Sequence, residues 1–402
     1  EAIDIEVGPL SPSDTGAPGN GDVHVPVTVT GKNRADRFEM PVPQHWLQAA
    51  TQLADQVDPL HPETQAVFAD LVIAQTHFQL GYDILITLSR PLLSHRTRAL
   101  VREANPRKPS ETGRIVGLFL RSRNNYTWQA SQHAKRMFDQ GLFYWVLTRH
   151  RLPNMWRYFS ACVHAEKARG DDTLYLGQSI LVRCVRSLEA RDAIGAQFYI
   201  PQNKNTRDAI MYHFDYLTIL LAGAFDAQAR IAHRAYRIRK PDEKHVSFSK
   251  RFSKCLRDNG ANDLYNIVSG QYYLDLMTLL RELRNTIHGA SLPTLAYQAG
   301  AAPQASFVTV LPEYQDKLWQ AAERCGSPEK WGLVRMHKVQ FEPYTYAVTL
   351  VDECFKQIDA IAAATDIAGL FPNGYTIPPL RDRPPDDDVF GEHIRKRLAI
   401  LG

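Results

Sequence analysis

Hydrophobic positions recur at helical spacing along most of the chain. Between residues 63 and 90, for example, Val67, Leu71, Ala74 and Phe78 fall three or four positions apart, which places them on one face of an α-helix. Pro, Gly and Asp residues interrupt this pattern and divide it into successive helices. The pattern predicts helices at about 44–57, 63–90, 114–120, 128–149, 154–168, 173–190, 206–236, 271–288, 313–325 and 343–364. A mainly α-helical protein is therefore expected.

Two stretches depart from the helical pattern. Residues 1–42 are rich in Pro, Gly, Asp and Ser, and their one alternating run, residues 23–29, contains Pro26. Because proline cannot donate a ladder hydrogen bond, this run predicts a short edge strand in an extended N-terminal arm. Residues 306–311 and 333–341 are short and alternating, and they predict a small β insertion at about 306–341 within the helical part.

The length of 402 residues favours at least two domains, since hydrophobic cores stop growing at roughly 250–300 residues. The polar segment 200–205 is the predicted boundary. The predicted organisation has four parts: an arm at 1–42, an α-helical domain with a sensor or partner-binding role at 43–200, a helical bundle with the β insertion at 201–370, and a Pro-rich tail at 371–402.

Composition narrows the classes of protein that remain. The five cysteines are odd in number, widely spaced and without a CxxC pair, which is typical of thiols in a reducing cytoplasm and gives no zinc framework. The longest uncharged apolar run, 216–225, is far shorter than the ~20 residues that cross a bilayer, and no basic-then-apolar leader follows Glu1. We therefore expect a cytoplasmic protein without a membrane partner, a metal or a cofactor.

The most informative segment is the predicted helix 271–288. On a helix at ~100° per residue, three basic side chains, Arg281, Arg284 and His288, lie along one shoulder of its apolar stripe. Long cationic side chains normally avoid the margin of a core unless an anion meets them there. The stripe itself consists of Tyr273, Leu276, Met277, Leu280, Leu283 and Ile287.

These residue types suit chemistry on RNA. Arginines can hold a phosphate, and a histidine, whose pKa lies near neutrality, can move a proton at cell pH. RNA cleavage in which the ribose 2′-hydroxyl is the nucleophile needs those two functions and no metal ion. We therefore interpret Arg281, Arg284 and His288 as candidate catalytic residues, with Asn285 orienting one of them by a hydrogen bond.

Arg281, which has six residues between it and His288, together with the string Leu-Arg-Asn-Thr-Ile-His-Gly at 283–289, resembles the signature of HEPN domains, in which an Arg precedes a His by four to six intervening residues and Asn often follows the Arg. The resemblance extends over about 206–365 and leaves two registers open, with either Arg281 or Arg284 as the family arginine. It implies a helical bundle that forms a homodimer or higher homo-oligomer and a metal-independent endoribonuclease that leaves a 2′,3′-cyclic phosphate. It also implies a role in antiphage defence, abortive infection or a toxin–antitoxin pair, with an antitoxin or defence-system partner protein.

A basic run supports an RNA partner in the same half of the chain. The whole-chain charge of +4 is too small to indicate a nucleic-acid binder by itself, but ten Lys or Arg residues lie between 230 and 257. Aromatic residues are interleaved with them, which suits phosphate contact and base stacking on single-stranded RNA. The predicted RNA-binding residues are Arg230, Arg234, Arg237, Arg239, Lys240, Lys250, Arg251 and Lys254.

Each of these interpretations has an alternative. The arginines of the 271–288 helix can be structural, held by Asp215 or Asp226 of the preceding long helix, in a HEPN-like bundle that binds or assembles without catalysis. The chain can also be a toxin whose partner covers the cleft. The basic run can be a solvated helix end and loop.

Overall fold

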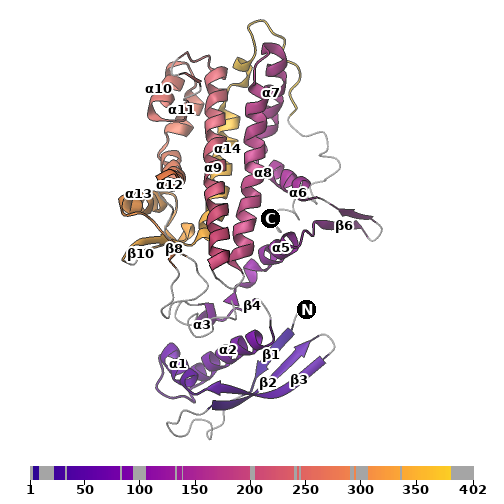
Figure 1. The fold of residues 1–402 in the computed structure, drawn as a ribbon, viewed down its shortest axis with the longest axis vertical. Coiled ribbons are helices and arrows are strands. Elements are labelled where there is room, and N and C mark those ends of the chain that lie inside the picture. Colours follow the sequence, from indigo (N-terminus) through magenta and orange to yellow (C-terminus); the bar gives the residue numbers. More distant parts are fainter. Residues whose placement is uncertain are drawn as a thin grey trace. The chain divides into compact units, whose positions relative to one another are not determined.

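The computed structural model describes residues 3–8, 22–31, 34–81, 84–93, 106–131, 134–137, 139–199, 204–239, 242–243, 246–289, 294–295, 307–335 and 337–381. At some of these positions, 286–289 among them, it describes the backbone alone. The chain is mainly helical, as predicted. It divides into two compact units, drawn in Figure 1: residues 1–115 with 199–202 and 296–306, and residues 116–198 with 203–295 and 307–402.

The first unit is built on a three-stranded antiparallel sheet, whose strands lie in the order β1-β2-β3. Alternate residues of the central strand, Val23, Val25 and Val27, are buried and pack with Phe68 and Leu71 of the following helices, because successive side chains of a strand point to opposite faces. The elements of this unit are β1 (Ile3–Val7), β2 (Asp22–Gly31), β3 (Arg34–Pro43), α1 (His45–Ala54), α2 (Pro62–Gln79), β4 (Leu85–Ile86), α3 (Arg90–Leu93), β5 (Pro106–Arg107) and η1 (Pro109–Glu111).

The expectation of an extended arm with one edge strand is wrong. Strand β2 is central and pairs with β1 on one side and β3 on the other. Pro26 is tolerated there because its carbonyl accepts a hydrogen bond from the Gly8 amide at 2.8 Å, one residue after β1 ends. The N–H and C=O of one strand residue point the same way, so the missing N–H faces the end of β1 and leaves no ladder bond unmade.

Four long helices form the centre of the second unit: α8 (Thr173–Phe198), α9 (Lys204–Ala235), α12 (Gln271–Gly289) and α14 (Pro343–Ala364). Helix α9 packs against the other three, and Figure 1 shows it between α8 and α12 with α14 behind. The buried side of α9 is lined by large side chains, such as Phe214 and Phe225, and by several alanines. The remaining helices are α5 (Thr112–Ser122), α6 (Gln140–Arg151), α7 (Met155–Arg169), α10 (Lys250–Asp258), α11 (Asn262–Ser269), α13 (Pro312–Arg324), η3 (Glu329–Trp331) and η4 (Ile367–Leu370).

The predicted domain boundary at residue 200 does not separate the two units. The polar break at 200–205 lies between α8 and α9, which belong to one unit and pack against each other. The segment 43–200, predicted as a single domain, is shared between the units: α1 and α2 lie in the first, and α6 to α8 lie in the second. A polar segment between two helical patterns does not by itself mark a domain boundary, and here both helices bury their apolar faces in the same core.

The helix predicted at 128–149 begins only at Gln140. Residues before it form the antiparallel hairpin β6 (Thr127–Ser131) and β7 (Ala134–Met137). The Asp139 side chain fixes the start of α6, because its carboxylate accepts a hydrogen bond from the Leu142 amide at 2.7 Å.

The predicted β insertion is present, with more strands than expected. Strands β8 (Thr294–Leu295), β9 (Phe307–Thr309), β10 (Leu333–Arg335) and β11 (Val339–Phe341) form a sheet in the order β10-β11-β9-β8. The segment 333–341 is a hairpin of two strands rather than one strand, and α13 connects β9 to β10.

The C-terminal segment after η4 follows the surface of α7 as far as the structure describes it. The Arg381 amide donates a hydrogen bond to the Ser160 hydroxyl at 3.2 Å. The rest of the predicted tail, 382–402, lies outside the described residues. No helix in the described ranges combines the length and the apolar character that crossing a bilayer requires.

Candidate anion-binding site on helices α8, α9 and α12

Helix α12 carries the predicted catalytic residues. Its apolar stripe is buried as expected, with Leu276, Leu280 and Leu283 at 1% exposure or less. Arg281 and Arg284 therefore lie at the margin of the core, where both side chains are half-buried, and Asn285 is exposed. The backbone of His288 belongs to the last turn of α12, and its side chain lies outside the described residues.

Asp226 of α9 faces the arginines of α12. Arg281 Nη2 lies 3.9 Å from Asp226 Oδ1, and the two side chains are 30% and 48% exposed. Burial raises the pKa of Asp226, while the charges of Arg281, Arg284 and Arg183 act in the opposite direction. Three guanidiniums therefore act electrostatically on this carboxylate, and Arg281 is at ion-pair distance from it.

Arg183 reaches this group from α8 because α9 has a glycine beside it. Arg183 Nε donates a hydrogen bond to the Ser179 hydroxyl at 3.1 Å. A Cβ atom at Gly223 would lie 2.1 Å from Arg183 Nη1, so the guanidinium occupies the space that a side chain would fill. Sequence reasoning missed Arg183. The available signal was Gly223 itself, since glycine inside a helix costs about 1 kcal/mol relative to alanine and calls for a packing reason.

Two buried polar atoms near this group, and one about three turns earlier on α9, have no hydrogen-bond partner among the described residues. Arg284 Nη1 donates to Asn285 Oδ1 at 3.4 Å, whereas Arg284 Nε is buried without an acceptor among the described residues. The Tyr273 hydroxyl is likewise buried without a hydrogen-bond partner among the described residues, and burial raises its pKa. Asp215 Oδ1 is also buried without a donor, and burial raises the pKa of this carboxyl. Of the two carboxylates predicted as alternative partners, Asp226 contacts Arg281, and no described ion pair involves Asp215.

The first three residues of the predicted RNA-binding run are engaged within the protein. Arg234 lies 2.6 Å from Glu243 and 2.5 Å from Asp172, and its side chain is 10% exposed. Arg230 contacts Glu243 at 3.4 Å. Arg237 donates through Nη2 to the Phe371 carbonyl at 3.0 Å. These arginines connect the end of α9 to neighbouring segments of the chain.

The later residues of the run are more accessible. Lys250, Arg251 and Lys254 are exposed on α10, and Arg239 is exposed after the end of α9. No hydrogen bond or ion pair within the described residues joins them to Arg281 or Arg284. Lys240 lies outside the described residues. The structure thus separates the predicted RNA-binding residues into an internally paired group and an exposed group.

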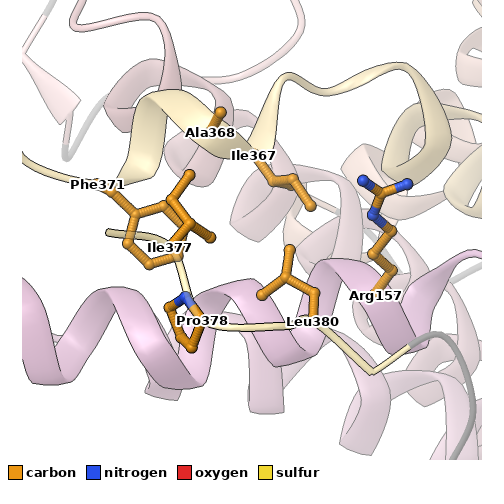
Figure 2. A pocket seen from close by; sticks show the side chains of 7 residues that line it. All are labelled: Arg157, Ile367, Ala368, Phe371, Ile377, Pro378 and Leu380. Atoms are coloured by element: carbon orange, nitrogen blue, oxygen red, sulfur yellow. The ribbon is translucent and has the colours of Figure 1, made fainter. Parts of the chain in front are cut away.

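Three hollows elsewhere in the second unit do not include the arginines of α12. Figure 2 shows a cavity of about 350 Å³ that is closed by the C-terminal segment and lined by apolar side chains, with Arg157 of α7 at one side. A neighbouring hollow of about 440 Å³ shares Arg157 and Ile367 with it. A third, of about 510 Å³, is lined by charged residues of α6, η3 and α14, among them Lys330 and Glu353.

No known protein supplies an assignment for this site. A scan against models of protein families found no match, and searches of curated proteins and of solved structures found none. Within the described residues, no group of three or more His, Cys, Asp or Glu side chains is arranged to hold a metal ion. The chemistry of the arginine group is therefore argued from its own geometry.

Proposed function

We propose that the chain is a metal-independent endoribonuclease of the HEPN type that arrests growth in antiphage defence or as the toxin of a toxin–antitoxin pair. One observation carries the proposal: Arg281 lies 3.9 Å from Asp226, and the charges of Arg183 and Arg284 act on the same carboxylate. Guanidiniums are the preferred side chains for phosphate because their planar donors match its oxygens. Two of these arginines, Arg281 and Arg284, lie on α12, the helix whose last turn includes His288.

The proposed reaction assigns one role to each residue. Arg281 and Arg284 neutralise the scissile phosphate, and Asn285 holds the Arg284 guanidinium through the hydrogen bond at 3.4 Å. His288 accepts the proton of the ribose 2′-hydroxyl as the 2′-oxygen attacks phosphorus. The bond from phosphorus to the 5′-oxygen breaks, and His288 of a second copy in a homodimer protonates this oxygen. The products are a 2′,3′-cyclic phosphate and a 5′-hydroxyl.

The Arg281–Asp226 contact favours a second candidate, a non-catalytic binding or assembly module. In that case Asp226 neutralises the arginines of α12, and their role is to hold α9 and α12 together. The length of 3.9 Å and the exposure of both side chains make this pair weak, since exposed ion pairs contribute about 0–1 kcal/mol. One weak pair leaves two guanidiniums uncompensated, so we place the nuclease first.

The test is cleavage of a labelled, unstructured RNA by the full chain in the presence of EDTA. We expect cleavage that ends in a 2′,3′-cyclic phosphate and that His288→Ala abolishes without changing the melting temperature. His45→Ala, at an exposed histidine of α1, is the matched control and should cleave normally. Cleavage that survives His288→Ala would contradict the mechanism, and the absence of cleavage together with a lower melting temperature in Arg281→Ala would favour the binding module.

Growth arrest is tested separately, because it does not require a known substrate. Expression of the chain in a bacterial host should stop growth, and expression of His288→Ala to the same level should not. Arrest that is equal for both proteins would contradict the proposed role.

A further inference from the structure

An exposed stripe of large side chains runs along α9 toward the arginine group. Tyr212, Tyr216 and Ile219 are 69%, 37% and 39% exposed. At ~100° per residue, these three positions and the following Gly223 and Asp226 fall within about 80° of one another. They therefore form one straight line on the solvent side of the helix, with the two tyrosines at one end and the carboxylate at the other.

Arginines lie on both sides of this line. Arg183 of α8 occupies the space above Gly223, and Arg281 of α12 contacts Asp226. Helix α9 packs between these two helices, so the guanidiniums approach the stripe from opposite directions. An exposed aromatic surface that leads into a positively charged group is the arrangement that proteins use for single-stranded nucleic acid.

We propose that Tyr212 and Tyr216 form a base-stacking platform for single-stranded RNA, whose phosphates are held by Arg183, Arg281 and Arg284. This proposal rests on the proposed function, because it uses the same arginines, and it names the substrate class. The platform binds bases by their faces, so it selects for unpaired bases rather than for a particular sequence.

The spacing of the two rings favours a single strand over a duplex. Residues four apart on a helix are separated by about 6 Å along its axis, whereas the bases of an A-form RNA duplex are paired and stacked on one another, so their faces are not available to a ring. One base on each ring therefore requires a strand that is stretched and unpaired. Asp208 lies one turn before Tyr212 and is exposed, so the strand is expected to extend from Tyr212 toward Arg183 and away from this carboxylate.

Charge decides between RNA and a second copy of the chain as the occupant. In a two-fold dimer through this face, the same surface of each copy meets itself. Arg183 and the arginines of α12 would then oppose like charges, which is unfavourable at short range. A polyanion meets the same charges favourably, so we assign the stripe to RNA; in the proposed homodimer the two arginine groups then face one cleft with the RNA between them.

The experiment measures RNA binding by the full chain with His288→Ala, which keeps the RNA intact. A labelled, unstructured oligonucleotide and a duplex of the same length are titrated with this protein and with the added variants Tyr212→Ala and Tyr216→Ala. We expect each alanine to weaken single-strand binding about tenfold, since base stacking on an aromatic side chain contributes that much. Tyr212→Phe and Tyr216→Phe keep the ring and should bind as the parent does.

Tyr175→Ala is the matched control, because Tyr175 is 66% exposed on α8 and lies outside the stripe. It should leave binding unchanged, and duplex binding should change little in every variant. The proposal is overturned if the parent does not bind the single strand, if the alanine variants bind it normally, or if light scattering shows that they have lost a second copy. Tyrosine-dependent binding without cleavage by the unmodified chain would support the platform while the proposed nuclease fails.

Discussion

Helix α9 takes part in two clusters of charged residues, which differ in the ratio of carboxylates to arginines. At its C-terminal end, Arg234 is 10% exposed and lies within 4 Å of three carboxylates, those of Asp171, Asp172 and Glu243. Farther from that end, Asp226 contacts Arg281 at 3.9 Å, and the charges of Arg183 and Arg284 also act on its carboxylate. The comparison teaches that cationic residues in a sequence show their role only when their partners are known.

In these two clusters, the pKa values of Asp172 and Asp226 are shifted in opposite directions. A hydrogen bond from Arg234 lowers the pKa of Asp172, so ionisation of this carboxyl stabilises the fold. Burial raises the pKa of Asp226 despite three nearby guanidiniums. A charged group that the fold stabilises poorly, in a partly buried setting rich in arginine, is typical of a functional site rather than of a structural ion pair.

The largest effect is expected from the arginines of α12. Arg281→Gln and Arg284→Gln should each slow RNA cleavage about 100-fold, because each removes a charge that stabilises the transition state at phosphorus. Initial rates at saturating RNA give this effect, and a melting curve checks the fold. Arg123→Gln, at an exposed position after the end of α5, is the control and should lower the rate little. A loss in only one of the α12 variants decides which arginine corresponds to the family signature, and equal rates in both contradict the assignment.

The next largest effect is on stability and comes from the other end of α9. Arg234→Ala should lower the free energy of unfolding by about 2 kcal/mol, since it removes the hydrogen bonds of a largely buried guanidinium to Glu243, Asp172 and Thr173 and leaves Arg169 and Arg230 as the remaining cations of this cluster. For a unit of this size, that corresponds to a fall of roughly 4–8 °C in the melting temperature. Cleavage measured well below the melting temperature should be unchanged. A normal melting temperature with impaired cleavage would reverse the roles that we assign to the two places.

The sequence predicted the second unit better than the first. The helices at 206–236 and 271–288 are long and amphipathic, and their local periodicity suffices to place them within a few residues. The sheet of the first unit depends on pairing between β1 and β2, which lie far apart in the sequence. Strand β1 also alternates, at Ile3, Ile5 and Val7, but it is short, and local pattern does not show which strands pair, so the central position of β2 could not be predicted.

The same reasoning explains what was predicted of the site. Arg281 and Arg284 were found because their place beside a buried stripe follows from the geometry of a single helix. Arg183 was not, because it comes from α8 and its proximity depends on how α8 and α9 pack. The pairing of Arg234 with Asp172 also joins residues distant in the sequence, so the sequence could not separate paired cations from available ones.

A smaller effect separates stability from binding at Gly223. Gly223→Ala should stabilise α9 by up to about 1 kcal/mol, because alanine is the better helix former. The new Cβ would lie 2.1 Å from Arg183 Nη1 and would displace this flexible guanidinium from the stripe. We therefore expect a higher melting temperature together with about threefold weaker binding of single-stranded RNA.

The matched variant is Arg183→Gln, which should weaken binding to the same extent without the gain in stability. Gly177→Ala is unsuitable as a control because its Cβ would meet Cys162 in the core. Unchanged binding in both variants would exclude Arg183 from the phosphate contacts.

The smallest effect, and the most direct comparison of the two places, is the pH dependence of Asp226→Asn and Asp172→Asn. The folded pKa of Asp226 is raised, so the ionised carboxyl costs stability as pH rises above about 4, and Asp226→Asn should be the more stable protein at pH 7. The folded pKa of Asp172 is lowered, so its contribution is present at pH 7 and is lost as pH falls below about 4, and Asp172→Asn should be the less stable protein at pH 7.

Both differences in the free energy of unfolding should stay below about 1 kcal/mol, because both side chains are half exposed, and both should vanish in acid. Urea unfolding at a series of pH values measures these differences. Differences of the same sign at pH 7 would show that Asp226, like Asp172, is held by its arginines, and the α12 group would then be structural.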